Sequence, residues 1–152
     1  MKVYTLKKTQ KISKGIETVF DFFSKPENLS KITPEKMGFQ IYTPSPIDMQ
    51  EGTLIDYTIK IMGLPIRWTT LITKYGPPKI FIDQQIKGPY SMWHHKHTFK
   101  EINKSETIIN DTVTYSLPFG FIGKIAHSIY VKNELNYIFS YREKKISQLL
   151  NS

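Results

Sequence analysis

The sequence contains no cysteine among its 152 residues. This absence excludes disulfide bonds, thiolate nucleophiles and cysteine-ligated zinc, and it favours a reducing compartment. Long apolar runs are also missing, because no stretch approaches the roughly 20 residues that span a bilayer. The N-terminal segment MKVYTLKKTQK lacks the apolar core and the small-residue cleavage site of a signal peptide. We therefore expect a soluble, cytoplasmic protein.

Several motifs that carry known chemistry are absent too. The sequence has no P-loop and no G-x-G-x-x-G, H-E-x-x-H or G-x-S-x-G pattern. No serine is marked out as a nucleophile, and no oxyanion motif accompanies one. We predict no cofactor.

Acidic residues are scarce, with 13 Asp and Glu against 21 Lys and Arg, a formal net charge of +8 and a pI near 9.5. Such an excess suits an anionic partner: nucleic acid, acidic lipid headgroups or an acidic ligand. The lysines are scattered, however, with small clusters only at Lys7–Lys8 and Lys144–Lys145. A lysine-rich surface that maintains solubility is the simpler interpretation. We therefore expect no nucleic-acid partner.

The first third of the chain predicts one strand and two short helices. No repeat or linker is visible, so residues 1–152 are interpreted as a single domain. Extended-type residues predict a strand over Lys2–Ile12. Apolar residues at helical spacing follow, and the helix that they predict ends before Pro26, which begins a second short helix. These helical positions are Ile16, Val19, Phe20 and Phe23.

The middle of the chain alternates between apolar and polar residues, which is typical of strands. Over residues 53–62, one face carries Ile55, Tyr57, Ile59 and Ile61. Turn signals at MGLP, YGPPK, KGPY and EINKSET separate further strands. These strands are predicted over residues 66–74 and 80–86, around residues 93–99 and around residues 109–117.

The last 30 or so residues predict one long helix, Phe121–Leu150, which would extend about 45 Å. Its apolar stripe comprises Phe121, Ile125, Ile129, Leu135, Ile138, Phe139, Ile146 and Leu149. Such a helix needs a large apolar surface, which a sheet can supply. We predict an α+β fold in which a curved antiparallel sheet wraps around the C-terminal helix, with two short helices between the first two strands.

Three of the four histidines lie within the segment GPYSMWHHKHTF, residues 88–99. Strand alternation places His95 and His97 on the apolar face with Trp93, and His94 on the polar face. A tight turn near Lys104 sets His97 opposite Asp111, because this register brings the apolar faces of both strands together. A shift of the strand register by two residues would keep the same side chains on the apolar face but would give His95 and His97 other cross-strand partners. The hypothesis is a His95–His97–Asp111 cluster inside an apolar cavity.

Three interpretations of this cluster remain open. The H-x-H pair with Asp111 has the composition of a two-histidine, one-carboxylate metal site, although the third ligand depends on the register. An imidazole beside a carboxylate in a dry pocket can also act as a general acid–base. The third interpretation is that the groups hydrogen-bond one another and orient the polar end of a ligand. The sequence favours the third interpretation, so we predict ligand binding, no catalysis and no metal.

Several strings resemble the SRPBCC superfamily, also called START-like, Bet v 1-like or helix-grip. The resemblance is strongest to a bacterial ligand-binding subfamily near the polyketide cyclase and coenzyme-Q-binding families. It implies a hydrophobic pocket between the sheet and the long helix, but no single chemistry. The strings are Phe20–Pro34, Gly52–Tyr57, Gly63–Trp68, Phe81–Phe99, Tyr115–Gly120 and Leu135–Arg142.

Other residues are candidates for the pocket. The aromatic residues Tyr57, Trp68, Trp93 and Tyr115 are candidates for its walls, although Tyr57, Trp68 and Tyr115 suit a plain core equally well. The resemblance draws attention to Asp83 and Gln85, whose facing is undecided because apolar residues occur on both faces of their strand. If they face inward, Asp83 can pair with His95.

Two features near the last helix are ambiguous. Arg142 lies inside the apolar stripe, where it either holds an acidic group or extends its charge to the helix edge. The segment LPFGFIG, Leu117–Gly123, suits a pocket lid, a loop that touches a membrane surface transiently, or an ordinary strand–helix joint.

The predicted function is binding, transport or sequestration of a small hydrophobic ligand such as a lipid, quinone or polyketide-like aromatic. The alternatives are a cyclase, hydratase or isomerase that uses His95 or His97 with Asp111 as acid–base, and an interaction module with a basic surface. The ligand and the oligomeric state do not follow from the sequence.

Overall fold

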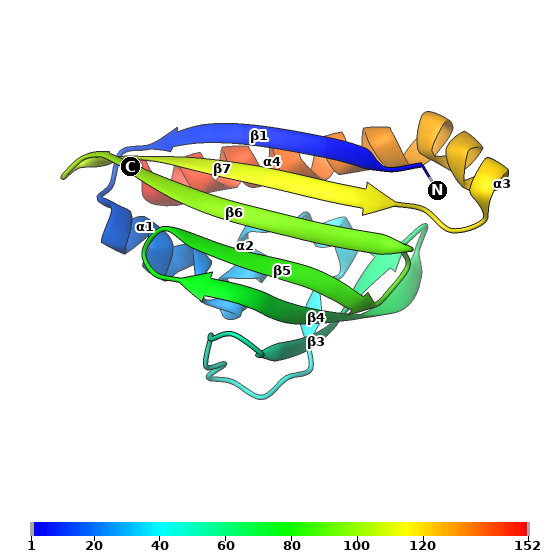
Figure 1. Ribbon diagram of the computed structural model, residues 1–152, viewed down its shortest axis with the longest axis horizontal. Helices are drawn as coiled ribbons and strands as arrows, with labels where there is room; N and C mark the ends of the chain where they lie inside the picture. Colours follow the sequence, from blue (N-terminus) through cyan, green and yellow to red (C-terminus); the bar gives the residue numbers. More distant parts are fainter. Residues whose placement is uncertain (1, 152) are drawn as a thin grey trace.

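A computed structural model describes residues 2–151. Its seven strands form one antiparallel sheet in the order β1-β7-β6-β5-β4-β3-β2. The sheet curves around the C-terminal helix (Figure 1). The strands are β1 Tyr4–Ile12, β2 Gln40–Ile41, β3 Leu54–Ile61, β4 Leu64–Gly76, β5 Ile80–Lys87, β6 Met92–Asn103 and β7 Glu106–Ser116.

Short helices connect β1 to β2, and one long helical segment ends the chain. The first group is α1 Ile16–Phe23, the 3₁₀ helix η1 Pro26–Asn28, α2 Leu29–Ile32 and the 3₁₀ helix η2 Glu35–Met37. The second comprises α3 Gly120–Ala126, the π-helical segment η3 His127–Val131 and α4 Lys132–Leu150. This arrangement confirms the predicted α+β helix-grip fold. No helix in residues 2–151 is both long and apolar enough to cross a membrane.

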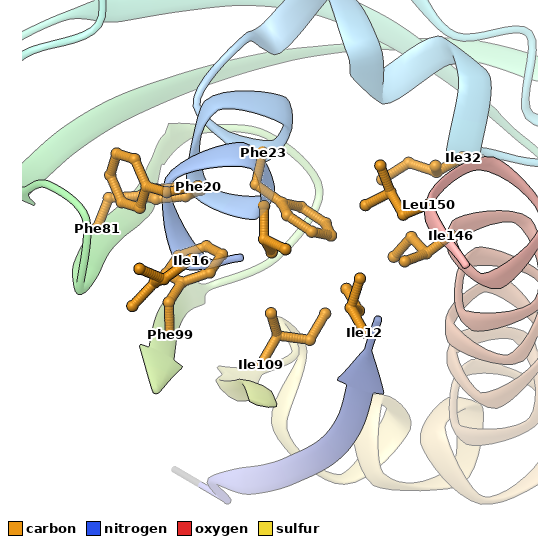
Figure 2. Close-up of a cluster of buried hydrophobic side chains, with 11 residues drawn as sticks. Ile12, Ile16, Phe20, Phe23, Ile32, Phe81, Phe99, Ile109, Ile146 and Leu150 are labelled. Carbon is orange, nitrogen blue, oxygen red and sulfur yellow. The ribbon is translucent and has the colours of Figure 1, made fainter. Parts of the chain in front are cut away.

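One end of the space between sheet and helix is filled by a hydrophobic core (Figure 2). Phe20 from α1 packs edge-on against Phe99 from β6 and Phe81 from β5, with ring centroids 5.0 and 6.0 Å apart. Ile146 of α4 and Ile12 of β1 belong to the same cluster and are fully buried. Burying each such side chain stabilises the fold by about 1.5–3 kcal/mol. This core anchors the helix to one end of the sheet.

The pairing of β6 with β7 has the predicted register. His97 lies opposite Asp111, His95 opposite Val113 and Trp93 opposite Tyr115. The tight turn at residues 104–105 and the apolar face that both strands share are together sufficient to determine this register.

The long helix differs from the prediction in its first half. Phe121, Ile125 and Ile129 are exposed rather than buried, and Leu149 near the end is also half exposed. The reason is the extent of the sheet, because α3 lies beyond the end of β7 and has no strands beneath it (Figure 1). The apolar stripe therefore meets the sheet only from Leu135 onward. The predicted first strand also begins later, at Tyr4 instead of Lys2.

Candidate functional site

A cavity of about 370 Å³ lies between the sheet and α4, beside the core. Its size is at the lower end of the range of about 300–1,000 Å³ that is usual for small-molecule sites. Both tryptophans of the chain, Trp68 and Trp93, contribute to its walls. The other main apolar contributors are Ile55, Tyr57, Ile59, Ile72, Tyr90, Leu135, Ile138 and Phe139.

The polar side chains of Asp83, His95, His97 and Arg142 meet at one part of the cavity wall, and Thr33, Lys60, Thr70 and Glu134 also line the cavity. The Nε2 atom of His97 lies 2.6 Å from Asp83 Oδ2. The Nε2 atom of His95 lies 2.9 Å from an oxygen of Asp111, which is buried behind the histidines. Because β5, β6 and β7 are adjacent strands, their backbone pairing brings these groups together.

The two imidazoles stack on each other between the two carboxylates. Their centroids are 3.7 Å apart and their planes differ by 25°. The second ring nitrogen of His97, Nδ1, lies 3.2 Å from Asp111, whereas Nδ1 of His95 is 3.8 Å from Asp83 and outside hydrogen-bonding range. The ring of Phe81 stacks on the other face of His97. His97 thus bonds both carboxylates, and His95 bonds one.

Arg142 reaches this cluster from α4. Its terminal nitrogen lies 3.6 Å from Asp111, and its guanidinium lies over the rings of Phe23 and Phe139. Its Nε atom is buried and has no hydrogen-bond partner in residues 2–151. A buried donor without a partner is costly. Arg142 therefore keeps one N–H group unsatisfied inside the protein, while the residue itself lines the cavity.

The pKa values of the two carboxyl groups are lowered. Burial alone would raise the pKa of Asp111, but the charge of Arg142 and the hydrogen bonds from both histidines hold it well below its usual range. For Asp83, burial again acts to raise the pKa, but the electrostatic attraction of the histidine pair and Arg142, together with the hydrogen bond from His97, outweighs it and lowers the pKa. Both groups are carboxylates at neutral pH.

The pKa values of the two histidines shift in opposite directions. Burial and the nearby charge of His97 lower the pKa of His95. Burial acts on His97 too, but its hydrogen bonds to Asp111 and Asp83 raise the pKa. The opposite shifts favour His97 over His95 as the site of a proton. With His97 protonated and His95 neutral, two carboxylates, one imidazolium and one guanidinium would balance to zero charge.

Asp83, His95 and His97 also form a set of three potential metal ligands, whose ligand atoms lie within 4.8 Å of one another. A divalent ion would require neutral imidazoles and would have to displace the proton of His97. The short bond to Asp83 and the raised pKa of His97 both favour the proton.

The structure separates the predicted site residues into three groups. Tyr57, Trp68, Asp83, Trp93, His95, His97 and Arg142 line the cavity. Asp111 supports the histidines from behind. Gln85 and Tyr115 lie outside the walls. The amide of Gln85 bonds the backbone of Tyr90, and the hydroxyl of Tyr115 lies 2.7 Å from His127 Nε2.

Sequence reasoning did not single out Tyr90, although it lies in the GPY string and packs its ring against Trp68 and Trp93. Leu135 and Phe139 were predicted only as members of the helix stripe, yet both line the cavity. Periodicity identifies a buried face but does not distinguish a filled core from a cavity wall.

The fold and the cavity between sheet and helix define the class of protein as helix-grip. No protein-family model matches the sequence, and no curated protein matches it significantly. Solved structures do match. A START superfamily protein from Mycobacterium smegmatis is 14% identical, with a TM-score of 0.71 over 95% of this chain and 98% of that one.

Two enzymes have similar structures. A Streptomyces aromatase/cyclase is 9% identical, with a TM-score of 0.69 over 97% of this chain and 96% of its own. Norcoclaurine synthase from Thalictrum flavum, in complex with dopamine and hydroxybenzaldehyde, is 15% identical, with a TM-score of 0.67 over 97% and 86%. These likenesses show that this chain has the START-like fold of the SRPBCC superfamily.

Proposed function

We propose that this protein binds a small, largely apolar molecule in the cavity, as one ligand-binding domain of the cytoplasm. The observation that carries the proposal is an apolar cavity that ends on a cluster of Asp83, His95, His97, Asp111 and Arg142, whose charged and polar groups pair with one another. The walls supply most of the affinity, and the cluster orients one polar end.

The charge balance of the cluster indicates the chemistry of that polar end. With the proton of the pair on His97, the charges of the cluster cancel, so a charged ligand group would add an unpaired charge to a buried site, which is costly. An uncharged group such as a carbonyl or hydroxyl avoids this cost. A hydroxyl can donate a hydrogen bond to the Nδ1 atom of His95, which makes no hydrogen bond in residues 2–151. Quinones, phenols and neutral polyketide-like aromatics therefore suit the site better than fatty acids.

Native mass spectrometry of the purified protein, followed by organic extraction, tests this proposal. We expect an additional mass that dissociates on denaturation and is recovered in the extract. The double variant Ile59→Phe/Ile138→Phe fills the cavity from both sides and should lose that mass. The variant Leu54→Phe, at an exposed position of the same sheet, should retain it. Retention of the mass by the filled variant would contradict binding in the cavity.

A second candidate function is acid–base catalysis, favoured by the opposite pKa shifts of His95 and His97. Neighbouring groups with separated pKa values can serve as base and acid in one reaction. In this case neutral His95 would accept a proton and His97 would donate one, as in a cyclase, hydratase or isomerase. Turnover of an identified ligand that is unchanged in His95→Gln and His97→Gln would exclude this function.

A further inference from the structure

Two exposed apolar segments lie near the cavity, and the ligand site does not explain them. One is the β3–β4 turn, with Met62 and Leu64. The other is the start of the C-terminal helix. The set comprises Met62, Leu64, Phe119, Phe121, Ile122, Ile125 and Ile129, with exposed fractions of 46–80%. We call these seven residues the apolar rim. Residues 122, 125 and 129 follow helical spacing and share one face of the helix.

The backbone at the rim is unfavourable for the residues that occupy it. Met62 and Phe119 are the two non-glycine residues with positive φ in residues 2–151, at 52° and 69°. Met62 and Gly63 form a two-residue hairpin turn in which both φ values are positive, a type I′ geometry that strongly prefers Asn-Gly. Large apolar side chains thus replace the residues that local structure favours, at positions where they extend into solvent. Local folding does not account for them.

Both segments of the rim border the mouth of the cavity. Met62 is 78% exposed and also lines the cavity. The cavity therefore opens to the surface beside this residue. Leu117, Tyr130 and Val131 line it from the other segment. The start of the C-terminal helix also lies at one end of the molecule, opposite the β6–β7 turn and the C terminus (Figure 1). An apolar molecule that enters the cavity passes the rim.

The sequence around both rim segments carries an excess of positive charge. Residues 57–82 and 112–133 contain no Asp or Glu, but they include Lys60, Lys124 and Lys132. Glu134 at the mouth is 3.1 Å from Lys36, which pairs its charge. A second copy of the chain would bring like charges together, but an anionic bilayer surface offers the opposite charge.

We propose that the apolar rim inserts into the interfacial region of an anionic lipid bilayer, with the cavity mouth facing the lipid. Apolar side chains enter the boundary between headgroups and acyl chains, and the neighbouring lysines contact acidic headgroups. This contact allows an apolar ligand to move between bilayer and cavity without crossing water. The docking does not depend on which ligand the cavity holds.

Vesicle flotation tests the proposal without any cavity ligand. Wild-type protein should float with phosphatidylglycerol-containing vesicles, bind pure phosphatidylcholine more weakly, and dissociate as salt rises. The variant Met62→Asn/Phe119→Asn removes two rim side chains and introduces a residue that tolerates positive φ. We expect it to fold at least as stably as wild type and to need about tenfold more lipid for half-binding, since large apolar groups dominate interfacial affinity.

The control variant Ile102→Asn/Leu149→Asn removes two exposed apolar side chains from the opposite end of the molecule and should bind vesicles like wild type. Three results would overturn the proposal. These are no flotation with anionic vesicles at low salt, equal flotation of the folded rim variant, or rim-dependent dimerisation in sedimentation velocity without vesicle binding. Loss of cavity ligand with retained flotation would affect only the proposed ligand function.

Discussion

His95 and His97 are two residues apart on one strand, yet their pKa values shift in opposite directions. The cause is the number of carboxylate contacts. His97 bonds both Asp83 and Asp111, and these bonds outweigh its burial. His95 bonds only Asp111, so burial and the charge of its neighbour prevail. The pair therefore favours His97 over His95 as the site of a proton.

Histidine-selective NMR titration measures this separation. We expect His97 to remain protonated above its unfolded pKa of about 6.5 and His95 to remain neutral below it. The stability that His97 contributes is complete below pH of about 6.5 and is lost as pH rises through its raised folded pKa. The pH dependence of stability that His95 contributes has the opposite sign. Because its folded pKa is lowered, the fold loses stability as the pH falls below about 6.5. If both rings titrated together near 6.5, the assigned hydrogen bonds would be wrong.

Asp111 contacts His95, His97 and Arg142, so its charge is the centre of the cluster. The substitution Asp111→Asn should lower the free energy of unfolding by about 3–5 kcal/mol, because it leaves buried positive charge without its partner. Urea denaturation at pH 7 measures this loss. Asp21→Asn, in the exposed pair with Lys25, should cost under about 1 kcal/mol. A similar small loss for Asp111→Asn would contradict the assigned ion pairs.

At the scale of secondary-structure elements, the joint between β7 and α3 determines where the long helix begins. Phe119 adopts a left-handed conformation and Gly123 packs against the backbone of Pro118. A Cβ atom at Gly123 would overlap the carbonyl oxygen of Pro118, which belongs to the main chain and cannot rotate away. This close approach requires glycine inside a helix, where glycine is otherwise unfavourable.

The substitution Gly123→Ala should therefore change the stability in the direction opposite to that given by helix propensity. In an open helix the change would stabilise by about 1 kcal/mol, but here we expect a loss of about 1–3 kcal/mol. Thermal unfolding checks the sign. Ser140→Ala, at an exposed position of α4, should be neutral or slightly stabilising. Stabilisation by Gly123→Ala would show that the joint has room for a side chain.

The elements differ in how far they could be predicted. The register of β6 and β7 follows from sequence because each strand has one apolar face and the turn between them is short. The inward facing of Asp83 does not follow, since Ile80, Phe81 and Ile82 make both faces of β5 apolar. The contact of Arg142 with Asp111 depends on how α4 lies across the sheet, which no local pattern encodes. For the same reason, the exposed apolar residues of α3 were predicted to be buried.

At the scale of the whole molecule, the hydrophobic core at one end holds the sheet and helix together, while the other end remains open as a cavity. The positions of the two tryptophans make this division measurable. Both Trp68 and Trp93 line the cavity, so the intrinsic fluorescence of the protein reports on what occupies it.

Titration of tryptophan emission with decan-1-ol and with decanoate is the most direct test of the proposed ligand site. We expect a saturable change with the alcohol, weaker binding of the carboxylate because Asp83 and Asp111 already place negative charge at the polar end of the cavity, and loss of both responses in Ile59→Phe/Ile138→Phe. An absence of saturable change with the alcohol, or an unchanged response in the filled variant, would show that the cavity is not the ligand site.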